Sequence, residues 1–301
     1  MLILPDNPKL IGQGITGSEG SKALETMLSY GTKVVGGVTP GKGGTDVLGV
    51  PVFNSVKELS EKFGEIDATV IYVPPLFVKA AAVEALEAGI KFLLIFTEKV
   101  PTSDSAYIYA LAQEKGANII GPSSVGLINP AKKLKIGSIG GADPDRVFKE
   151  GNICIISKSG GMSSEIGLHL RNNGLGVSYA LGIGGDRIAG TDFADFLMAV
   201  EDDPNTQASV IFGELGGTYE ERVAEMVKAG KIKKPIVAFI AGEFTMTLPS
   251  EVQFGHAGAI IEGERGKPDH KRMVLKESGV LVVEDFDQIA GLLKKALQFK
   301  I

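Results

Sequence analysis

The feature that most constrains the fold of this chain is a regular alternation of short apolar segments and longer helical segments. In the first half, the apolar segments lie at residues 9–14, 32–38, 68–73, 91–97 and 118–122. They are apolar throughout rather than at every second position, which is typical of strands buried on both faces of a parallel sheet. The helical segments between them lie at residues 18–31, 76–89 and 103–116. The pattern predicts an α/β fold with helices on both faces of a parallel sheet.

The alternation starts again in the second half, after a less regular stretch at residues 122–150. Strands are predicted there at residues 152–157, 176–184, 208–214, 235–242 and 280–285. Helices are predicted at residues 160–174, 192–203, 220–230, 270–279 and 286–299. A chain of 301 residues is long enough for two domains with separate cores. We therefore predict a Rossmann-type domain over residues 1–146 and a second open α/β domain over residues 147–301.

Composition narrows the classes of function. A formal net charge of −5 gives the chain no general attraction for nucleic acid. The single cysteine, Cys154, rules out a disulfide within the chain and suits a reducing compartment. No apolar run reaches about 18 residues, and the chain does not open on a signal-peptide pattern. We therefore expect a soluble, cytoplasmic protein without a membrane partner.

The segment "GQGITGSEG" at residues 12–20 places a G-x-G-x-x-G pattern between a predicted strand and a predicted helix. Such a turn binds dinucleotides when an acidic residue follows the second strand, but here that strand leads to Lys42 instead. A lysine suits a phosphate-bearing ligand, such as the phosphorylated adenosine of coenzyme A, better than NAD. A tight turn without a ligand is the third interpretation. The chain has no G-x-x-x-x-G-K-[ST] pattern, so a nucleotide for phosphate chemistry is expected on another chain.

The segment "SKSGGMSSE" at residues 157–165 follows the first predicted strand of the second half. A Ser/Gly turn at the start of a helix exposes backbone N–H groups and the positive end of the helix dipole, which together bind anions. Alternatively, Ser159 or Ser163 simply caps an ordinary helix. This segment alone leaves both interpretations open.

His256 lies in "GHAGA", where small neighbours leave both faces of the imidazole accessible. A neutral imidazole that attacks phosphorus needs its second ring nitrogen held by an acceptor, and Glu214 at the end of another predicted strand is the candidate. A hydrolase triad is disfavoured because no G-x-S-x-G occurs, and a zinc site because no cysteine or second histidine lies nearby in sequence. An incidental histidine in a tight turn remains the alternative. His169 and His270 are expected to be structural or surface residues.

Several motifs together resemble the alpha subunit of succinyl-CoA synthetase and the matching segment of ATP-citrate lyase. These motifs are "GITGSEG", "GGVTPGKGG", "IYVPP", "FTE", "GIGGD", "GELGG" and "GHAGA". The resemblance covers essentially the whole chain. It implies an N-terminal CoA-binding domain and a flavodoxin-like second domain that carries a transiently phosphorylated histidine.

The resemblance also implies roles for individual residues and for a partner. Coenzyme A would contact Thr16, Gly17, Ser18, Glu19, Lys42, Phe96, Thr97 and Glu98. His256 would be the phosphohistidine with Glu214 beside it, and the substrate acid or phosphate would lie against Ser159, Gly160, Gly161 and Ser164. A large beta subunit with an ATP-grasp site would hold ATP and Mg, so no metal site is expected on this chain.

The expected function is therefore the small subunit of an ATP-dependent acid–thiol ligase. Succinyl-CoA synthetases usually read S-R-S-G-T-L-T-Y-E, whereas this chain has Lys158 for the arginine, Gly161 for the threonine and Ser164 for the tyrosine. The loss of two larger side chains, together with "GGDRIAGTDF", resembles ATP-citrate lyase and favours citrate, with Arg187 as a further cation. Succinate is the alternative acid. A non-catalytic CoA-binding regulator and an NAD oxidoreductase are the alternatives of other classes.

Overall fold

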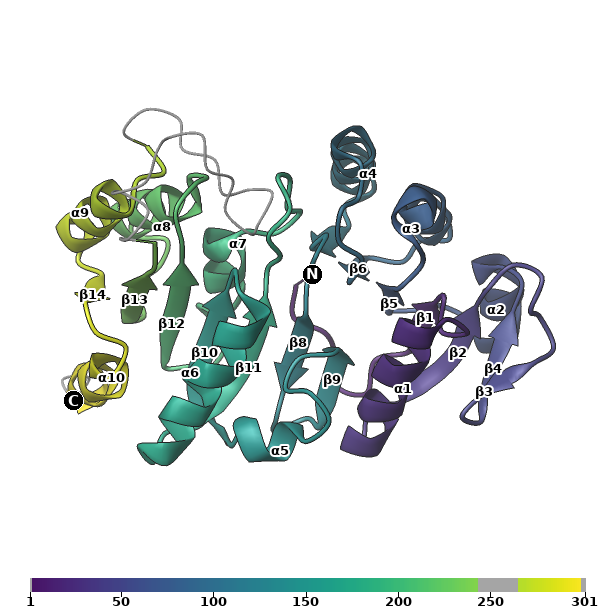
Figure 1. The fold of residues 1–301 in the computed structure, drawn as a ribbon, viewed down its shortest axis with the longest axis horizontal. Helices are drawn as coiled ribbons and strands as arrows, with labels where there is room; N and C mark the ends of the chain where they lie inside the picture. The colour runs from purple at the N-terminus through teal and green to yellow at the C-terminus, as the bar shows by residue number, and fades with distance from the viewer. Residues whose placement is uncertain (1, 243–264, 299–301) are drawn as a thin grey trace.

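The computed structural model describes residues 2–242 and 265–298 as two sheets that lie side by side, each flanked by helices (Figure 1). In the first sheet the strand order is β3-β4-β2-β1-β5-β6-β7. All neighbours in it pair in parallel except β3 and β4. Its strands are β1 (Leu10–Gln13), β2 (Val34–Val38), β3 (Asp46–Val47), β4 (Val50–Phe53), β5 (Ala68–Ile71), β6 (Phe92–Ile95) and β7 (Asn118–Ile120). Its helices are α1 (Ser18–Tyr30), α2 (Val56–Phe63), the short 3-10 helix η1 (Pro75–Phe77), α3 (Val78–Glu87) and α4 (Thr102–Lys115).

The second sheet has the strand order β14-β13-β12-β10-β11-β8-β9. The β10 to β14 part is parallel, whereas β8 runs antiparallel to both β11 and β9. Its strands are β8 (Gly126–Asn129), β9 (Leu134–Gly137), β10 (Glu150–Ser157), β11 (Val177–Gly182), β12 (Ala208–Gly213), β13 (Ile236–Ile240) and β14 (Leu281–Val283). Its helices are α5 (Pro144–Val147), α6 (Gly160–Asn172), α7 (Phe193–Ala199), α8 (Tyr219–Lys228), α9 (Pro268–Ser278) and α10 (Gln288–Gln298).

The predicted α/β class is confirmed, and the structure adds elements that the sequence pattern did not reveal. Between β2 and β5, where no strand or helix was predicted, the chain forms the β3–β4 hairpin and then α2. The irregular stretch at residues 122–150 contributes β8 and β9 to the second sheet. The chain thus passes from one sheet to the other between β7 and β8, ahead of the predicted domain boundary at residues 146/147, which stays a prediction. The strands β8 and β9 were not predicted because they are short and because β9 carries a lysine.

That lysine, Lys135, joins the two halves of the molecule. Its side chain is fully buried, and its ammonium group donates to the Thr26 hydroxyl of α1 at 2.8 Å and to the Gly141 carbonyl at 2.5 Å. The Thr32 hydroxyl, just beyond α1, bonds the backbone N–H and C=O of Lys135, each at 2.8 Å. Burial lowers the pKa of Lys135 to about 8. Helix α1 is therefore fixed at its C-terminal end to the second sheet.

Apolar packing also crosses the boundary between the sheets. The largest buried cluster includes Met27 of α1 and Ile136 of β9, each with at most 1% of its surface exposed. Within the described ranges, no helix combines the length and the apolar character needed to cross a membrane.

Candidate functional site

The first glycine loop folds tightly at the end of β1. Gly14 has φ +85°, a conformation that favours glycine, and a Cβ on Gly20 would lie 2.5 Å from the Gly14 carbonyl oxygen. Helix α1 then begins at Ser18, with Gly17 as N-cap and no side chain capping it. Gly17 and Ser18 are exposed, so the backbone N–H groups of the first turn face a position where an anion can bind.

The loop after β2 is held beside this turn. The Thr16 hydroxyl donates to the Thr39 hydroxyl at 3.2 Å, which links the two loops directly. The side-chain oxygen of Asn54 accepts from the N–H groups of Gly41 at 2.9 Å and Gly43 at 3.0 Å. Lys42 between them is exposed. The fold thus orders the backbone around Lys42 and leaves its ammonium group accessible.

An open cavity of about 670 Å³ lies where the first sheet meets the second. It brings together Glu19, Phe96, Thr97 and Glu98 of the predicted CoA contacts. The other predicted contacts, Thr16, Gly17, Ser18 and Lys42, do not line it, although the structure describes all four. Its remaining walls are Tyr72, Val73, Pro74, Pro75, Lys99, Ser123, Ser124 and Val125.

Several contacts shape this cavity. The Thr97 hydroxyl donates to the Val73 carbonyl at 2.7 Å, and the Ser123 N–H donates to the Thr97 carbonyl at 2.9 Å. The rings of Tyr72 and Phe96 lie 5.2 Å apart, and burial raises the pKa of Tyr72. Residues 123–125 were not predicted as coenzyme A contacts, because they belong to the connection between the two sheets and lie far in sequence from the first glycine loop.

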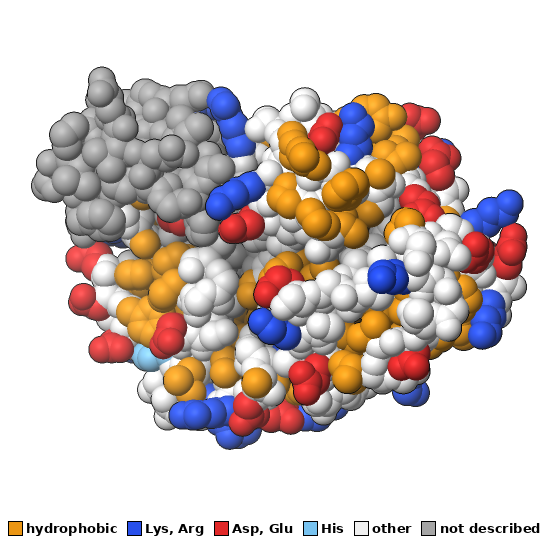
Figure 2. All heavy atoms as spheres, turned by 45° about the vertical axis from the view of Figure 1, so that its right-hand side comes forward, with side chains coloured by type: hydrophobic (Ala, Val, Ile, Leu, Met, Phe, Trp, Pro, Cys, Tyr) orange, Lys and Arg blue, Asp and Glu red, His pale blue; other side chains and the backbone are white. Residues whose placement is uncertain are grey.

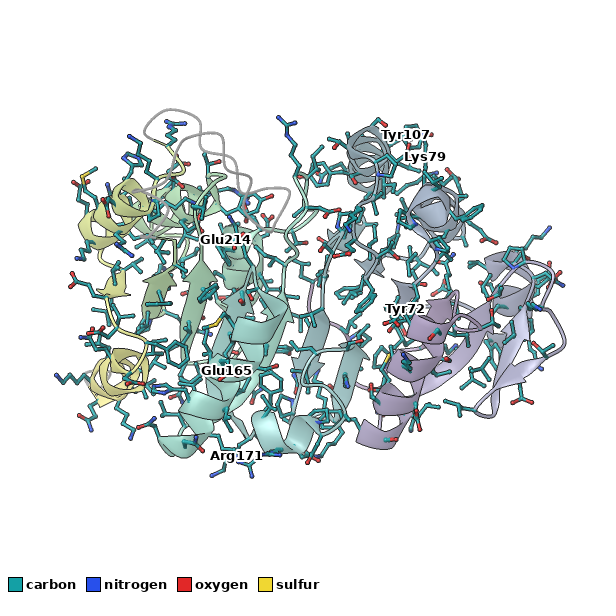
Figure 3. All side chains as sticks on the ribbon, viewed as in Figure 1. Tyr72, Lys79, Tyr107, Glu165, Arg171 and Glu214 are labelled. Carbon is teal, nitrogen blue, oxygen red and sulfur yellow. The ribbon has the colours of Figure 1, made fainter. Side chains whose placement is uncertain are left out.

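One wall of the cavity leads to exposed apolar side chains. Pro75 of that wall is the first residue of η1, where Leu76 is 78% and Phe77 62% exposed, whereas Glu19, Glu98 and Lys99 place charged groups at the cavity. Figure 2, which brings the first half forward, shows apolar side chains gathered on this face. In Figure 3 Tyr72 lies in the first half and Glu214 in the second, with the connection between the halves between them.

The second glycine loop follows β10. The Ser157 hydroxyl donates to the Ser159 carbonyl at 2.7 Å and accepts from the Ser159 N–H at 3.0 Å, which forms a tight turn. The Ser159 hydroxyl accepts from the Met162 N–H at 3.4 Å, so Ser159 is the N-cap of α6. The capping interpretation of this segment is therefore correct for Ser159.

Gly160, Gly161 and Ser164 occupy the first turns of α6. A Cβ on Gly160 would lie 2.9 Å from Val125, so this position requires glycine. Gly161 is exposed, and a Cβ there would meet only the Ser159 hydroxyl oxygen, at 4.0 Å. Ser164 is half-buried. The space beside Gly161 is thus open.

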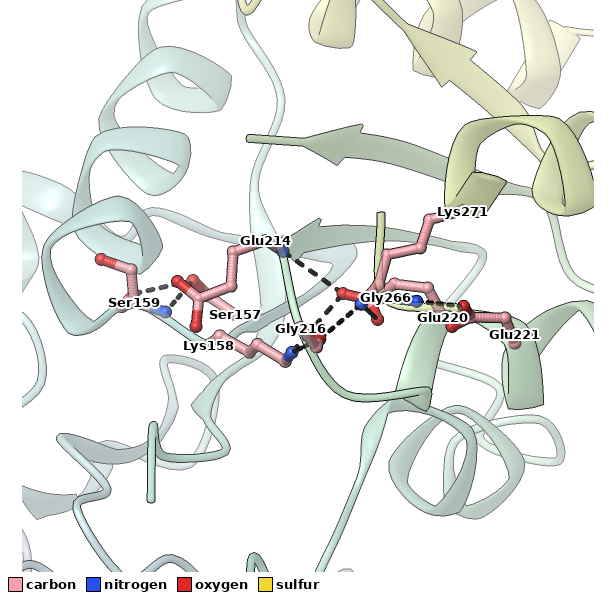
Figure 4. Close-up of polar contacts among 9 residues, drawn as sticks. All are labelled: Ser157, Lys158, Ser159, Glu214, Gly216, Glu220, Glu221, Gly266 and Lys271. Carbon is pink, nitrogen blue, oxygen red and sulfur yellow. Dashed lines mark hydrogen bonds and ion pairs between the residues drawn. The ribbon is translucent and has the colours of Figure 1, made fainter. Parts of the chain in front are cut away.

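Glu214 lies directly after β12 and is half-buried. Figure 4 shows its carboxylate directed toward the Ser157–Ser159 turn. It lines a cavity of about 200 Å³ together with Lys158, Arg187 and Tyr219. The structure therefore brings Glu214, Lys158 and Arg187 to one place at the carboxyl ends of the strands, where ligands bind in open α/β sheets.

Of the three histidines, His256 lies outside the described residues. His169 on α6 is half-buried, with its ring 5.0 Å from that of Phe286 and its Nδ1 4.0 Å from the Asp287 carboxylate. His270 lies in the first turn of α9.

A cluster of buried charges lies beneath the Glu214 loop, and we call Lys158, Glu220 and Lys271 the Glu220 cluster (Figure 4). The Glu220 carboxylate accepts from the Lys271 ammonium group and lies 3.8 Å from that of Lys158. Burial alone would raise the pKa of Glu220, but the two lysines outweigh it and the pKa is lowered. Burial lowers the pKa of Lys271, with Glu220 opposing it. The local sequence does not reveal this cluster, because Glu220 opens the helical segment predicted at residues 220–230 and both of its lysine partners lie far from it in sequence.

Comparison with known proteins assigns the chain to a family. A model of the CoA-binding domain matches residues 6–99, and a model of the succinyl-CoA ligase-like flavodoxin domain matches residues 150–296. The ADP-forming succinate–CoA ligase subunit alpha 2 of Archaeoglobus fulgidus is 44% identical over 98% of this chain and 99% of its own length. The chain belongs to the family of succinate–CoA ligase alpha subunits.

Other relatives and structural neighbours of the chain carry different names. A subunit of an ADP-forming sulfoacetate–CoA ligase from an Acholeplasma species is 42% identical over 95% of both chains. The ATP citrate lyase of Methanosaeta concilii superposes with a TM-score of 0.89 at 25% identity and 98% coverage of this chain. This chain spans half the length of that lyase chain. The family predicted from the motifs is confirmed, and so is the predicted class of enzyme, since the Archaeoglobus and Acholeplasma relatives are named as CoA ligases.

Proposed function

We propose that this chain is the alpha subunit of a nucleotide-dependent ligase that joins a carboxylic acid to coenzyme A through a phosphohistidine at position 256. The observation that carries the proposal is the placement of Glu214. Its carboxylate leaves the end of β12 toward the turn that starts α6, inside the domain that matches the ligase model. A carboxylate at this strand end can accept the N–H of one imidazole nitrogen and leave the other nitrogen free to attack phosphorus.

The proposed reaction has three steps. A ring nitrogen of His256 attacks the γ-phosphorus of the nucleoside triphosphate. The bond between the γ-phosphorus and the β–γ bridging oxygen breaks, and the nucleoside diphosphate leaves. An oxygen of the acid's carboxylate then attacks the phosphorus, the N–P bond breaks, and an acyl phosphate forms. Finally the thiolate of coenzyme A attacks the acyl carbon and phosphate leaves. The start of α6, at Gly160 and Gly161, stabilises negative charge in these steps without moving.

The first half of the chain fits coenzyme A as the second substrate. The uncapped start of α1 at Gly17 and Ser18, with Thr16 and Lys42 nearby in the adjoining loops, suits the phosphate groups. The cavity lined by Glu19, Phe96, Thr97 and Glu98 suits a long arm, because apolar side chains such as Val73 and Val125 also line it.

A partner subunit completes the enzyme in this proposal. Several relatives are named as alpha subunits, and this chain has no P-loop motif of its own. We assign the ATP and Mg site to a large ATP-grasp beta subunit and place the complex in the cytoplasm. On this basis the chain alone binds coenzyme A but has no turnover.

For the acid we propose citrate. The support is the open space beside Gly161 and the short side chain of Ser164, which leave room for a tricarboxylate against Ser159. Succinate is the second candidate, favoured by the names of relatives that are more than 40% identical over most of the chain. Sulfoacetate, named for another relative, also carries a second acidic group.

The test uses the chain co-purified with its ATP-grasp partner. Phosphate release that depends on coenzyme A is measured with citrate, succinate, malate and sulfoacetate. We expect release with citrate to exceed the others, and a clear preference for succinate would replace citrate by the second candidate. Labelling with radioactive ATP should give base-stable, acid-labile phosphate that is lost in His256→Ala. Coenzyme A binding without any labelling would favour a non-catalytic regulator.

A further inference from the structure

The Glu220 cluster places charged groups where they are costly. Glu220 and Lys271 have 0% of their surface exposed, and Lys158 has 6%. A buried ion pair often stabilises a fold no more than apolar side chains of the same size would. Charges that persist in a core next to a candidate site therefore call for a role other than stability.

Glu220 is the centre of the cluster. One of its carboxylate oxygens accepts from the backbone N–H of Glu214 at 3.3 Å and faces Lys158, while the other accepts from Lys271. Both lysines also donate to a single backbone oxygen, the Gly216 carbonyl, at 3.1 Å for Lys158 and 2.7 Å for Lys271. The cluster thus binds the backbone on both sides of the Glu214 side chain, once at its own N–H and once two residues later.

The elements that supply these groups converge from three parts of the chain. Lys158 follows β10, Glu220 lies in the first turn of α8, and Lys271 lies on α9. A second pair of contacts holds the same loop, because the Gly216 N–H donates to the Gly266 carbonyl at 2.8 Å and the Gly266 N–H to the Glu221 carboxylate at 3.2 Å. The Glu214 loop is therefore fixed by the start of α9 as well as by α8.

We propose that Glu220 and Lys271 are positioning residues that hold the Glu214 backbone so that its carboxylate stays directed at the Ser157–Ser159 turn. The inference rests on the proposed function, in which Glu214 orients His256. An orienting group that drifts by about 1 Å can cost as much as about a hundredfold in rate. Apolar side chains at both positions would fill the same space but leave the Glu214 N–H without its acceptor and Gly216 with one donor fewer.

Two double variants separate positioning from stability. In Glu220→Gln/Lys271→Met, the amide oxygen at position 220 can still accept from the Glu214 N–H and its NH₂ can donate to Gly216. In Glu220→Leu/Lys271→Met, neither contact is available. Both remove the same ion pair and both leave Lys158 in place, but the Leu/Met variant also leaves the Glu214 N–H without an acceptor, which should lower its free energy of unfolding by a further amount of about 1–3 kcal/mol.

The readout is the initial rate of His256 labelling by ATP in the complex with the partner subunit. We expect the Gln/Met variant within about threefold of wild type and the Leu/Met variant slower by about tenfold or more. Turnover should follow labelling, with kcat reduced and KM for coenzyme A unchanged, since coenzyme A binds in the other half. The matched control is Lys228→Met/Glu277→Gln, which removes an exposed 3.7 Å ion pair between the same two helices and should change nothing.

Equal labelling rates in the Leu/Met and Gln/Met variants, measured at a temperature where both are folded, would overturn the inference. If the Leu/Met variant does not fold, Lys271→Met alone takes its place: it removes one donor to Gly216, and we expect labelling slowed about threefold. An unchanged rate in that variant would remove Lys271 from the positioning role. A wild-type complex that takes up no phosphate would overturn the proposed function itself, and this inference with it.

Discussion

The two halves of the molecule use the same architecture but build their strand-end sites in different ways. In the first half, backbone shape makes the site: Gly14 and Gly20 allow a close turn, and α1 starts without a side-chain cap. In the second half, the Glu220 cluster holds the site from below by buried charges. A site formed by the backbone should tolerate substitutions that change charge but not those that add side-chain bulk. A site held by buried charges should be sensitive to the loss of a charge and more tolerant of added bulk.

The largest expected effect comes from breaking the buried pair in the second half. Glu220→Leu alone leaves two buried lysines without their carboxylate, so the free energy of unfolding should fall by about 3–5 kcal/mol. Urea unfolding of the isolated chain measures it. Glu19→Leu at the exposed start of α1 is the counterpart in the first half and should change the free energy by less than about 0.5 kcal/mol. An equal decrease in the free energy of unfolding in Glu220→Leu and Glu19→Leu would contradict this difference between the two halves.

The contribution of Lys135, which links the two halves, to the free energy of unfolding should depend on pH. The pKa of Lys135 is lowered to about 8 in the folded state, against about 10.4 in an unfolded chain. Between these values the unfolded chain binds more protons, so stability should rise with pH, by at most about 3 kcal/mol. The measurement is the free energy of unfolding from pH 7.5 to 10.5 in wild type and Lys135→Met. If the difference between the two proteins is flat over this window, the ammonium group does not titrate as described.

A smaller effect is expected from added bulk in the first half. Gly20→Ala places a Cβ 2.5 Å from the Gly14 carbonyl, which should cost about 1–3 kcal/mol of stability and weaken coenzyme A binding at least about tenfold. Calorimetry with coenzyme A measures the second effect. Gly161→Ala in the second half, where a Cβ meets only open space, is the matched control and should leave both quantities nearly unchanged.

The smallest effect concerns the choice of acid. Gly161→Thr/Ser164→Tyr restores the side chains of the succinate pattern and fills the open space beside Ser159. The ratio of kcat/KM for citrate to that for succinate should fall about tenfold, a difference of about 1.4 kcal/mol. Assays of the complex with both acids check this. An unchanged ratio would show that these two positions do not select the acid.

The sequence predicted those parts of the fold and site that leave a local signal. Apolar segments marked the parallel strands, and the glycines at residues 12–20 marked the turn before α1, because both depend on neighbouring residues. β8 left no such signal, since its pairing with β11 joins residues more than 50 positions apart, and β9, which pairs with β8, is short and carries Lys135. The burial of Glu220 could not be predicted for a related reason. It depends on Lys158, which follows β10, and on Lys271 of α9, and both lie far from Glu220 in the sequence.

The central claim is that Glu214 at the end of β12 orients a phosphorylated His256, and one measurement tests it most directly. The complex with the ATP-grasp partner is incubated with radioactive ATP, and the rate of acid-labile, base-stable labelling is compared in wild type, Glu214→Gln and His256→Ala. We predict labelling in wild type, labelling slowed by about a hundredfold in Glu214→Gln, and none in His256→Ala. Labelling of Glu214→Gln at the wild-type rate, or persistent labelling of His256→Ala, would contradict the account.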